Sequence, residues 1–127
     1  MRAEGVGVRL LIVEDDADIR DSLSELLAAE GFDVAIADNG RAALDHLAAC
    51  KLLPQVILLD LMMPVMNGEQ FRVAQLADDR YAGIPVVIMS AARDVAQTGE
   101  RMKAAAILKK PLGIDPLVES LRRAALP

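Results

Sequence analysis

Aromatic side chains are scarce in this chain: Phe, Tyr and Trp together make up 2% of the 127 residues, and Trp is missing altogether. A surface that stacks nucleic-acid bases and an aromatic-lined cofactor pocket are therefore both unexpected. The single cysteine, Cys50, excludes an internal disulfide and favours a reducing compartment. No apolar run reaches the roughly 18 residues of a membrane span, and the N-terminus lacks the pattern of a signal peptide. These absences predict a soluble cytoplasmic protein that makes no membrane contact.

Positive charge is also in short supply, with 14 Lys and Arg against 19 Asp and Glu, a formal charge of -5 and a pI of about 4.8. Such an acidic chain binds the phosphate backbone poorly, so we expect no direct contact with DNA or RNA. A cation site or a basic protein partner suits this charge. The hydrophobic share of 54% predicts a folded core, and the length suits one domain over residues 1–127 with a core from about 8 to 125.

Five short apolar runs alternate along the chain with segments of helical periodicity. We interpret the runs as strands: Val8–Val13, Phe32–Ala37, Gln55–Leu59, Val86–Met89 and Ala105–Lys109. The third predicted helix follows Gly68 and carries Phe71, Val73, Ala74 and Leu76. Strands and helices that alternate through short connections indicate an α/β fold, with a parallel sheet and helices on both of its faces.

Polar side chains follow four of these runs, at the point where each predicted strand ends. They are Glu14, Asp15 and Asp16 after the first run, Asp60 after the third, Ser90 after the fourth and Lys110 after the fifth. The carboxyl ends of parallel strands share one edge of a sheet, and ligands bind there in open α/β sheets. With strand order 2-1-3-4-5, Glu14, Asp15 and Asp60 meet in one pocket. A plainer interpretation is that Asp60 only caps the following loop and that the other acids enrich a helix N-terminus.

Three clustered carboxylates repel one another, by roughly 4 kcal/mol for a pair about 4 Å apart at an effective dielectric near 20. Protonation of one carboxylate or a divalent cation can offset this repulsion. The oxygen ligands favour Mg²⁺, with Mn²⁺ as an alternative, and the lack of Cys and His in the cluster disfavours zinc and copper. With the Ser90 hydroxyl and the Lys110 ammonium nearby, the set suits phosphoryl transfer to a carboxylate, and the product is an aspartyl phosphate on Asp60.

Four stretches, LIVEDD, VILLDLMMPVMNG, VVIMSA and LKKP, stand in this order at four predicted strand ends. Together they resemble the receiver domain of bacterial two-component response regulators, in the form of a single-domain chemotaxis regulator. The resemblance implies a flavodoxin-like (βα)5 sandwich that receives a phosphoryl group from a sensor histidine kinase or a histidine phosphotransfer protein. It also implies a cis bond between Lys110 and Pro111. The implied site residues are Asp60 as phosphoacceptor and metal ligand, Glu14 and Asp15 as the acidic metal pair, the backbone carbonyl of Met62 as a further metal ligand, and Ser90 and Lys110 as contacts of the phosphoryl group.

The chain departs from the family pattern around its fifth strand. Three residues before the lysine, where the family often has Phe or Tyr, this chain has Ile107. The stretch from Ser90 to Lys110 is also shorter than usual, and it contains a polar predicted helix at about Arg93–Lys103. We therefore hypothesise that switching relies on Ser90 and on loop movement. We expect no output domain after Pro127. The expected output is therefore a downstream protein bound to the face of the fourth helix, fifth strand and fifth helix, a homodimer, or a phosphate relay.

Two other functions share part of this pattern. A Mg²⁺-dependent phosphatase of the haloacid dehalogenase type also has an Asp after a parallel strand, but it needs a second Asp two residues later, where this chain has Met62. A receiver that is never phosphorylated would act only as a binding module. The favoured interpretation predicts no enzyme activity beyond the domain's own phosphorylation and dephosphorylation.

Overall fold

The computed structural model describes residues 7–91, 95–110 and 113–126. Five parallel strands form one sheet in the order β2-β1-β3-β4-β5. The strands are β1 (Arg9–Val13), β2 (Asp33–Ala37), β3 (Val56–Asp60), β4 (Val86–Ser90) and β5 (Ala106–Lys109). The helices are α1 (Ala17–Ala29), α2 (Gly40–Ala49), α3 (Gly68–Leu76), α4 (Val95–Arg101) and α5 (Ile114–Ala124). The predicted α/β class, the parallel sheet and the strand order are confirmed.

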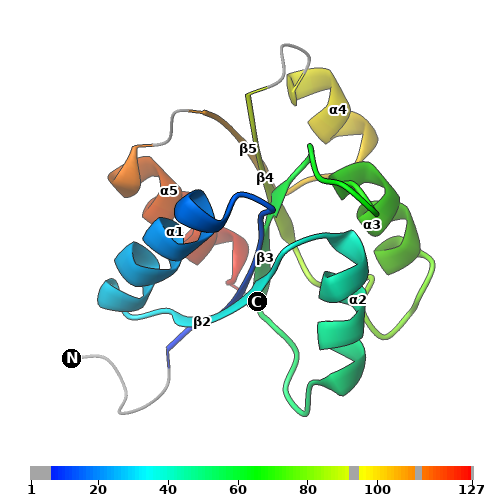
Figure 1. Ribbon diagram of the computed structural model, residues 1–127, viewed down its shortest axis with the longest axis horizontal. Coiled ribbons are helices and arrows are strands. Elements are labelled where there is room, and N and C mark those ends of the chain that lie inside the picture. The colour runs from blue at the N-terminus through cyan, green and yellow to red at the C-terminus, as the bar shows by residue number, and fades with distance from the viewer. Residues whose placement is uncertain (1–6, 92–94, 111–112, 127) are drawn as a thin grey trace.

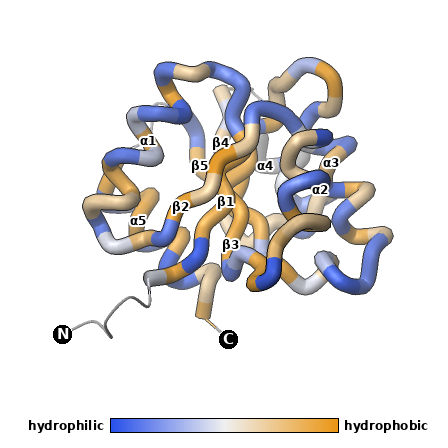
Figure 2. Tube along the Cα trace, turned by 60° about the horizontal axis from the view of Figure 1, so that its bottom comes forward, coloured by the Kyte–Doolittle hydropathy of each residue, from blue (hydrophilic) through white to orange (hydrophobic). Residues whose placement is uncertain are grey.

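Helices cover both faces of the sheet, with α1 and α5 on one face and α2, α3 and α4 on the other (Figure 1). Alternate residues of the central strands therefore enter two different cores. Leu11 and Ile57 pack with the second group of helices, whereas Leu10 and Leu58 pack with α1 and α5. Figure 2 shows the hydrophobic colour concentrated along the strands. Burial on both faces explains why the third and fourth strands read as continuous apolar runs.

Helices α1, α2 and α3 each begin with a residue whose side chain caps the helix. All three caps lie at or near the carboxyl edge of the sheet. Asp16 accepts hydrogen bonds from the amides of Asp18 and Ile19 at the start of α1. Asn39 caps α2, and Asn67 forms a reciprocal capping box with the third residue of α3. Each cap satisfies amides that have no partner inside the helix, so the chain turns sharply from strand to helix at this edge.

Helix α3 turns a different face to the core than its apolar residues suggest. Phe71 is fully buried, but Val73 is 71% exposed and Leu76 is 38% exposed. Arg72 and Gln75 are buried in their place. Hydrogen bonds from Arg72 and Gln75 to backbone carbonyls make the burial of these two polar side chains favourable.

The fourth helix is shorter in the described residues than the predicted span of about Arg93–Lys103, and it runs over Val95–Arg101. Its predicted start lies outside the described residues. Lys103, directly after the helix, has a φ of 55°, a left-handed conformation that non-glycine residues rarely adopt. None of the helices described in this structure is long and apolar enough to cross a membrane.

Candidate functional site

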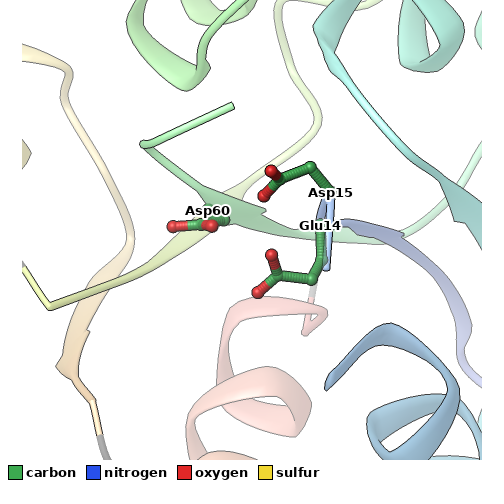
Figure 3. Close-up of side chains that lie close together, drawn as sticks. All are labelled: Glu14, Asp15 and Asp60. Atoms are coloured by element: carbon green, nitrogen blue, oxygen red, sulfur yellow. The ribbon is translucent and has the colours of Figure 1, made fainter. Parts of the chain in front are cut away.

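Three carboxylates meet at the carboxyl edge of the sheet, as the strand order predicts. Glu14 and Asp15 follow β1, and Asp60 ends the neighbouring strand β3, where Val13 pairs with Leu59. One oxygen from each carboxylate lies within 4.8 Å of the others. Figure 3 shows the three side chains gathered around one space at the strand ends. The arrangement can hold a hard cation, because each residue offers an oxygen ligand.

Lys110 forms ion pairs with the two buried carboxylates of this cluster. Glu14 is 1% exposed and Asp60 is 4% exposed, whereas Asp15 is exposed. The Nζ of Lys110 lies 3.0 Å from Oε1 of Glu14 and 3.5 Å from Oδ2 of Asp60. The other oxygen of Asp60 accepts a long hydrogen bond of 3.4 Å from the amide of Met62. Asp60 is therefore oriented from two sides.

The protonation of Lys110 is secured by its carboxylate neighbours. Burial by itself lowers the pKa of an ammonium group, but the hydrogen bond to Glu14 and the charges of Asp60 and Glu14 outweigh this effect. The net result is a pKa raised above the usual lysine value. Lys110 thus carries its positive charge at neutral pH. Two negative charges of the cluster are left uncompensated, which is the charge of one divalent cation.

The negative charge of Asp15 is held unfavourably in this cluster. Desolvation raises the pKa of its carboxyl, and the hydrogen bond and negative charge of Glu14 raise the pKa further. A folded-state pKa above the unfolded value means that the charged form opposes folding once the pH exceeds both values. Without a cation, Asp15 therefore works against the stability of the fold at pH 7.

We expect Asp15→Asn to raise the free energy of unfolding at pH 7 in a chelator, by up to about 1 kcal/mol for this exposed group. Urea denaturation measures the change. The stability gain of Asp15→Asn should shrink at pH 3, where the wild-type carboxyl is protonated and therefore neutral, like the amide. With excess Mg²⁺, wild type should gain stability and Asp15→Asn should gain less. A variant that is less stable than wild type in the chelator would contradict the assigned repulsion.

Two residues outside the predicted set hold the loop after β1. The amide of Asp16 donates to Oε2 of Glu14 over 3.1 Å, and Arg20 donates from Nη1 to the carbonyl of Glu14 over 3.1 Å. Asp16 itself acts as the N-cap of α1. The sequence carried no signal for Arg20 beyond its place one turn into α1. These contacts fix the backbone that presents Glu14 and Asp15.

The loop after Asp60 is anchored at both ends and strained in its middle. The amide of Gly68 donates to the carbonyl of Leu61 over 3.0 Å. The amide of Met66 donates to the carbonyl of Pro64 over 2.7 Å, and Val65 between them has a φ of 67°. This is the geometry of a γ-turn, which is unfavourable for a β-branched residue. The turn leaves the side chain of Val65 82% exposed beside the site.

Ser90 and Lys110 lie next to each other at the same edge. Ser90 is fully buried at the end of β4, and its strand neighbour on β5 is Lys109. The amide of Lys110 donates to the carbonyl of Ser90 over 3.0 Å. Lys109 itself is exposed. Pro111 and its expected cis bond lie outside the described residues.

The model of the family described as "Response regulator receiver domain" matches residues 10–122. This chain is a response regulator receiver domain. Among solved structures, the receiver is similar to the chemotaxis response regulator CheY4 of Vibrio cholerae, with a TM-score of 0.83, 29% identity and coverage of 94% of this chain and 99% of that one. It is also similar to the receiver domain of the Francisella response regulator 1452, with a TM-score of 0.82, 25% identity and coverage of 94% and 97%.

Curated relatives of the receiver are response regulators. The DNA-binding response regulator MtrA of Mycobacterium tuberculosis (strain ATCC 25618 / H37Rv) is 35% identical over 116 residues, which cover 90% of this chain and 49% of MtrA. The response regulator MprA of Mycolicibacterium vanbaalenii is 32% identical over 119 residues, which cover 91% and 49%. The receiver spans about half the length of the curated relatives it matches. The predicted family and signalling class are confirmed.

Proposed function

We propose that the receiver accepts a phosphoryl group on Asp60 from a phosphohistidine of a sensor histidine kinase or of a histidine phosphotransfer protein. One observation carries this proposal: Asp60 is buried at the end of a central strand, between an acidic pair and the ammonium of Lys110. A carboxylate held in this way has a fixed position beside a positive charge, and in phosphoryl transfer positioning and charge neutralisation do most of the work.

The residues at this edge fit a divalent cation, Mg²⁺ or Mn²⁺. The ligands would be the carboxylates of Glu14, Asp15 and Asp60, together with the backbone carbonyl of Met62. The close approach of the three carboxylates supports this set, because their repulsion is otherwise met only in part by Lys110. When bound, the cation neutralises negative charge on the transferred phosphoryl oxygens.

The chain's own groups account for the rest of the transfer. A carboxylate oxygen of Asp60 forms a new bond to phosphorus, and the bond between phosphorus and the donor nitrogen breaks. The donor imidazole keeps the electron pair of that bond. Lys110 and the hydroxyl of Ser90 would hold the phosphoryl oxygens, which places a full positive charge and a hydrogen-bond donor on one side of the acyl phosphate.

The signal would leave the receiver through a protein contact. We assign this contact to the face of α4, β5 and α5, occupied by a downstream protein or by a second receiver as a homodimer. MtrA is a DNA-binding regulator about twice as long as the matched region. For this receiver, the acidic composition supports protein contacts in place of direct nucleic-acid binding. Its place of action would be the cytoplasm, which is typical of response regulators.

Incubation with acetyl phosphate and Mg²⁺ should add one phosphoryl group to the intact chain, as measured by mass spectrometry. Asp60→Asn should abolish the uptake, because an amide cannot form the acyl phosphate, and a chelator should suppress it in wild type. Equal uptake by Asp60→Asn would show that the site is elsewhere. Missing uptake in wild type with measurable Mg²⁺ binding would favour a binding-only receiver, and steady release of phosphate from small phosphomonoesters would favour the phosphatase.

A further inference from the structure

Helix α3 places a buried guanidinium against the end of helix α4. Arg72 is 5% exposed. Its Nε donates to the carbonyl of Met102 over 2.9 Å, and its Nη2 donates to the carbonyl of Lys103 over 3.1 Å. These carbonyls follow the last residue of α4, Arg101, at the end of the helix where carbonyls lack helical partners and the dipole is negative. A cation is therefore favoured there.

A second buried polar residue fixes the orientation of Arg72. Nη1 of Arg72 donates to Oε1 of Gln75 over 2.8 Å. The side-chain Nε2 of Gln75 in turn donates to the carbonyls of Tyr81 and Ile84, over 2.9 and 3.0 Å. Arg72 takes part in none of the ion pairs among the described residues. Its burial is thus offset by directional bonds to backbone and amide oxygens, which hold it in one position.

The same stripe of α3 touches the backbone of Asp60. Gly68 is the first residue of the helix, and a Cβ atom at Gly68 would lie 2.6 Å from the carbonyl oxygen of Asp60. Arg72 follows four residues later, just over one turn, on nearly the same side and about 6 Å along the helix axis. A shift of the backbone at Asp60 therefore acts on the first turn of α3, and α3 carries Arg72 with it as a rigid element.

The end of α4 is in turn packed against β5. A Cβ atom at Gly99 would lie 2.0 Å from Cδ1 of Ile107, so the isoleucine occupies the space that this glycine leaves. Met102 is buried in the core on the same side of the sheet. A displacement at Met102 and Lys103 must therefore reach Gly99 and Ile107, because close-packed groups do not deform independently.

We propose that Arg72 is a positioning residue that transmits a change at Asp60 to the face of α4 and β5, by moving α3 and the C-terminal end of α4 as one unit. This inference rests on the proposed function of Asp60. It provides a route to the output face in a receiver in which Ile107 stands at the position of the usual aromatic residue. The route runs through α3 and its hydrogen bonds to α4.

The test uses the whole chain with Mg²⁺ and beryllofluoride, a phosphoryl mimic, and follows backbone amide chemical shifts by NMR. Met62 and Gly68 report on the site, and Gly99 and Ile107 report on the output face. Arg72→Met fills a similar volume without donors. Arg101→Gln is the matched control, because it removes the exposed ion pair of 2.9 Å with Glu69 that also joins α3 to α4. Thermal melts verify that each variant is folded.

In wild type and Arg101→Gln, both groups of amides should shift on adding the mimic. In Arg72→Met, Met62 and Gly68 should still shift, and the shifts at Gly99 and Ile107 should fall to about half or less of their wild-type size. Full wild-type shifts at Gly99 and Ile107 in Arg72→Met would overturn the inference. If wild type shows no shift at Met62 and Gly68, the proposed function fails instead, and the inference fails with it.

A second variant covers the case in which Arg72→Met does not fold. Arg72→Lys keeps the positive charge but replaces the planar fork of donors with a single ammonium. Its shifts at Gly99 and Ile107 should lie between those of wild type and zero. Wild-type shifts in this variant, with wild-type shifts at the site, would overturn the inference on their own.

Discussion

Replacing Gly68 by alanine should lower the free energy of unfolding by about 3 kcal/mol, the upper end of the usual cost of overpacking. The added Cβ would lie 2.6 Å from the carbonyl oxygen of Asp60 and 2.8 Å from Cα of Leu61. Both contacts are with backbone atoms, which cannot swing aside as a side-chain end can. The first turn of α3 or the end of β3 must move. We therefore also expect slower phosphoryl uptake from acetyl phosphate, because Asp60 ends that strand.

Gly83 offers a matched control on the same chain. A Cβ atom at Gly83 would meet no other atom within 4 Å, and its φ is not in the left-handed region. Gly83→Ala should leave stability unchanged or raise it by about 0.4–1 kcal/mol through the unfolded state. Urea denaturation of both variants measures the difference. Equal midpoints for the two variants would contradict the close approach of Gly68 to Asp60.

Lys110→Met should slow phosphoryl uptake by about 100-fold, the usual effect of removing one positioned donor from developing negative charge. The variant should also lose about 2 kcal/mol of stability in a chelator, less than for a fully buried pair. The side chain of Lys110 is 23% exposed, and its removal leaves Glu14 and Asp60 buried without their cation. Excess Mg²⁺ should restore part of the stability but not the rate.

Lys109→Met is the control for Lys110→Met, because it removes the same charge from an exposed neighbour. It should keep both the rate of uptake and the stability of wild type. The pH dependence gives an independent check. Since the folded-state pKa of Lys110 is raised, its stabilising effect should be present below pH 10.5 and be lost as the pH rises through the folded-state value. Equal losses in the two variants would contradict the assigned role of Lys110.

The sequence predicts the sheet and the cluster because both depend on simple patterns. Continuous apolar runs mark strands buried on both faces, and the carboxyl ends of parallel strands must share one edge. Asp60, Glu14 and Asp15 therefore come together once the strand order is known. The ammonium of Lys110 lies closer to Glu14 than to Asp60, a detail that depends on side-chain packing and has no signature in the sequence.

Other features depend on contacts between distant parts of the chain and escape such patterns. Arg72 is polar in sequence, yet backbone carbonyls about 30 residues away make its burial favourable. Val65 and Lys103 have the positive φ angles that favour glycine, so their residue types give no sign of these conformations. The close packing of Ile107 against Gly99 also brings α4 and β5 together, and neither segment's sequence predicts this contact.

Chemical mapping of the acyl phosphate tests most directly whether Asp60 carries the phosphoryl group. After incubation with acetyl phosphate and Mg²⁺, borohydride reduces an aspartyl phosphate to homoserine, and peptide mass spectrometry locates the changed residue. We predict homoserine at position 60 alone, and none in a sample kept in chelator. Homoserine at Asp15 or at another aspartate, or phosphorylated chain with no homoserine at all, would contradict the account.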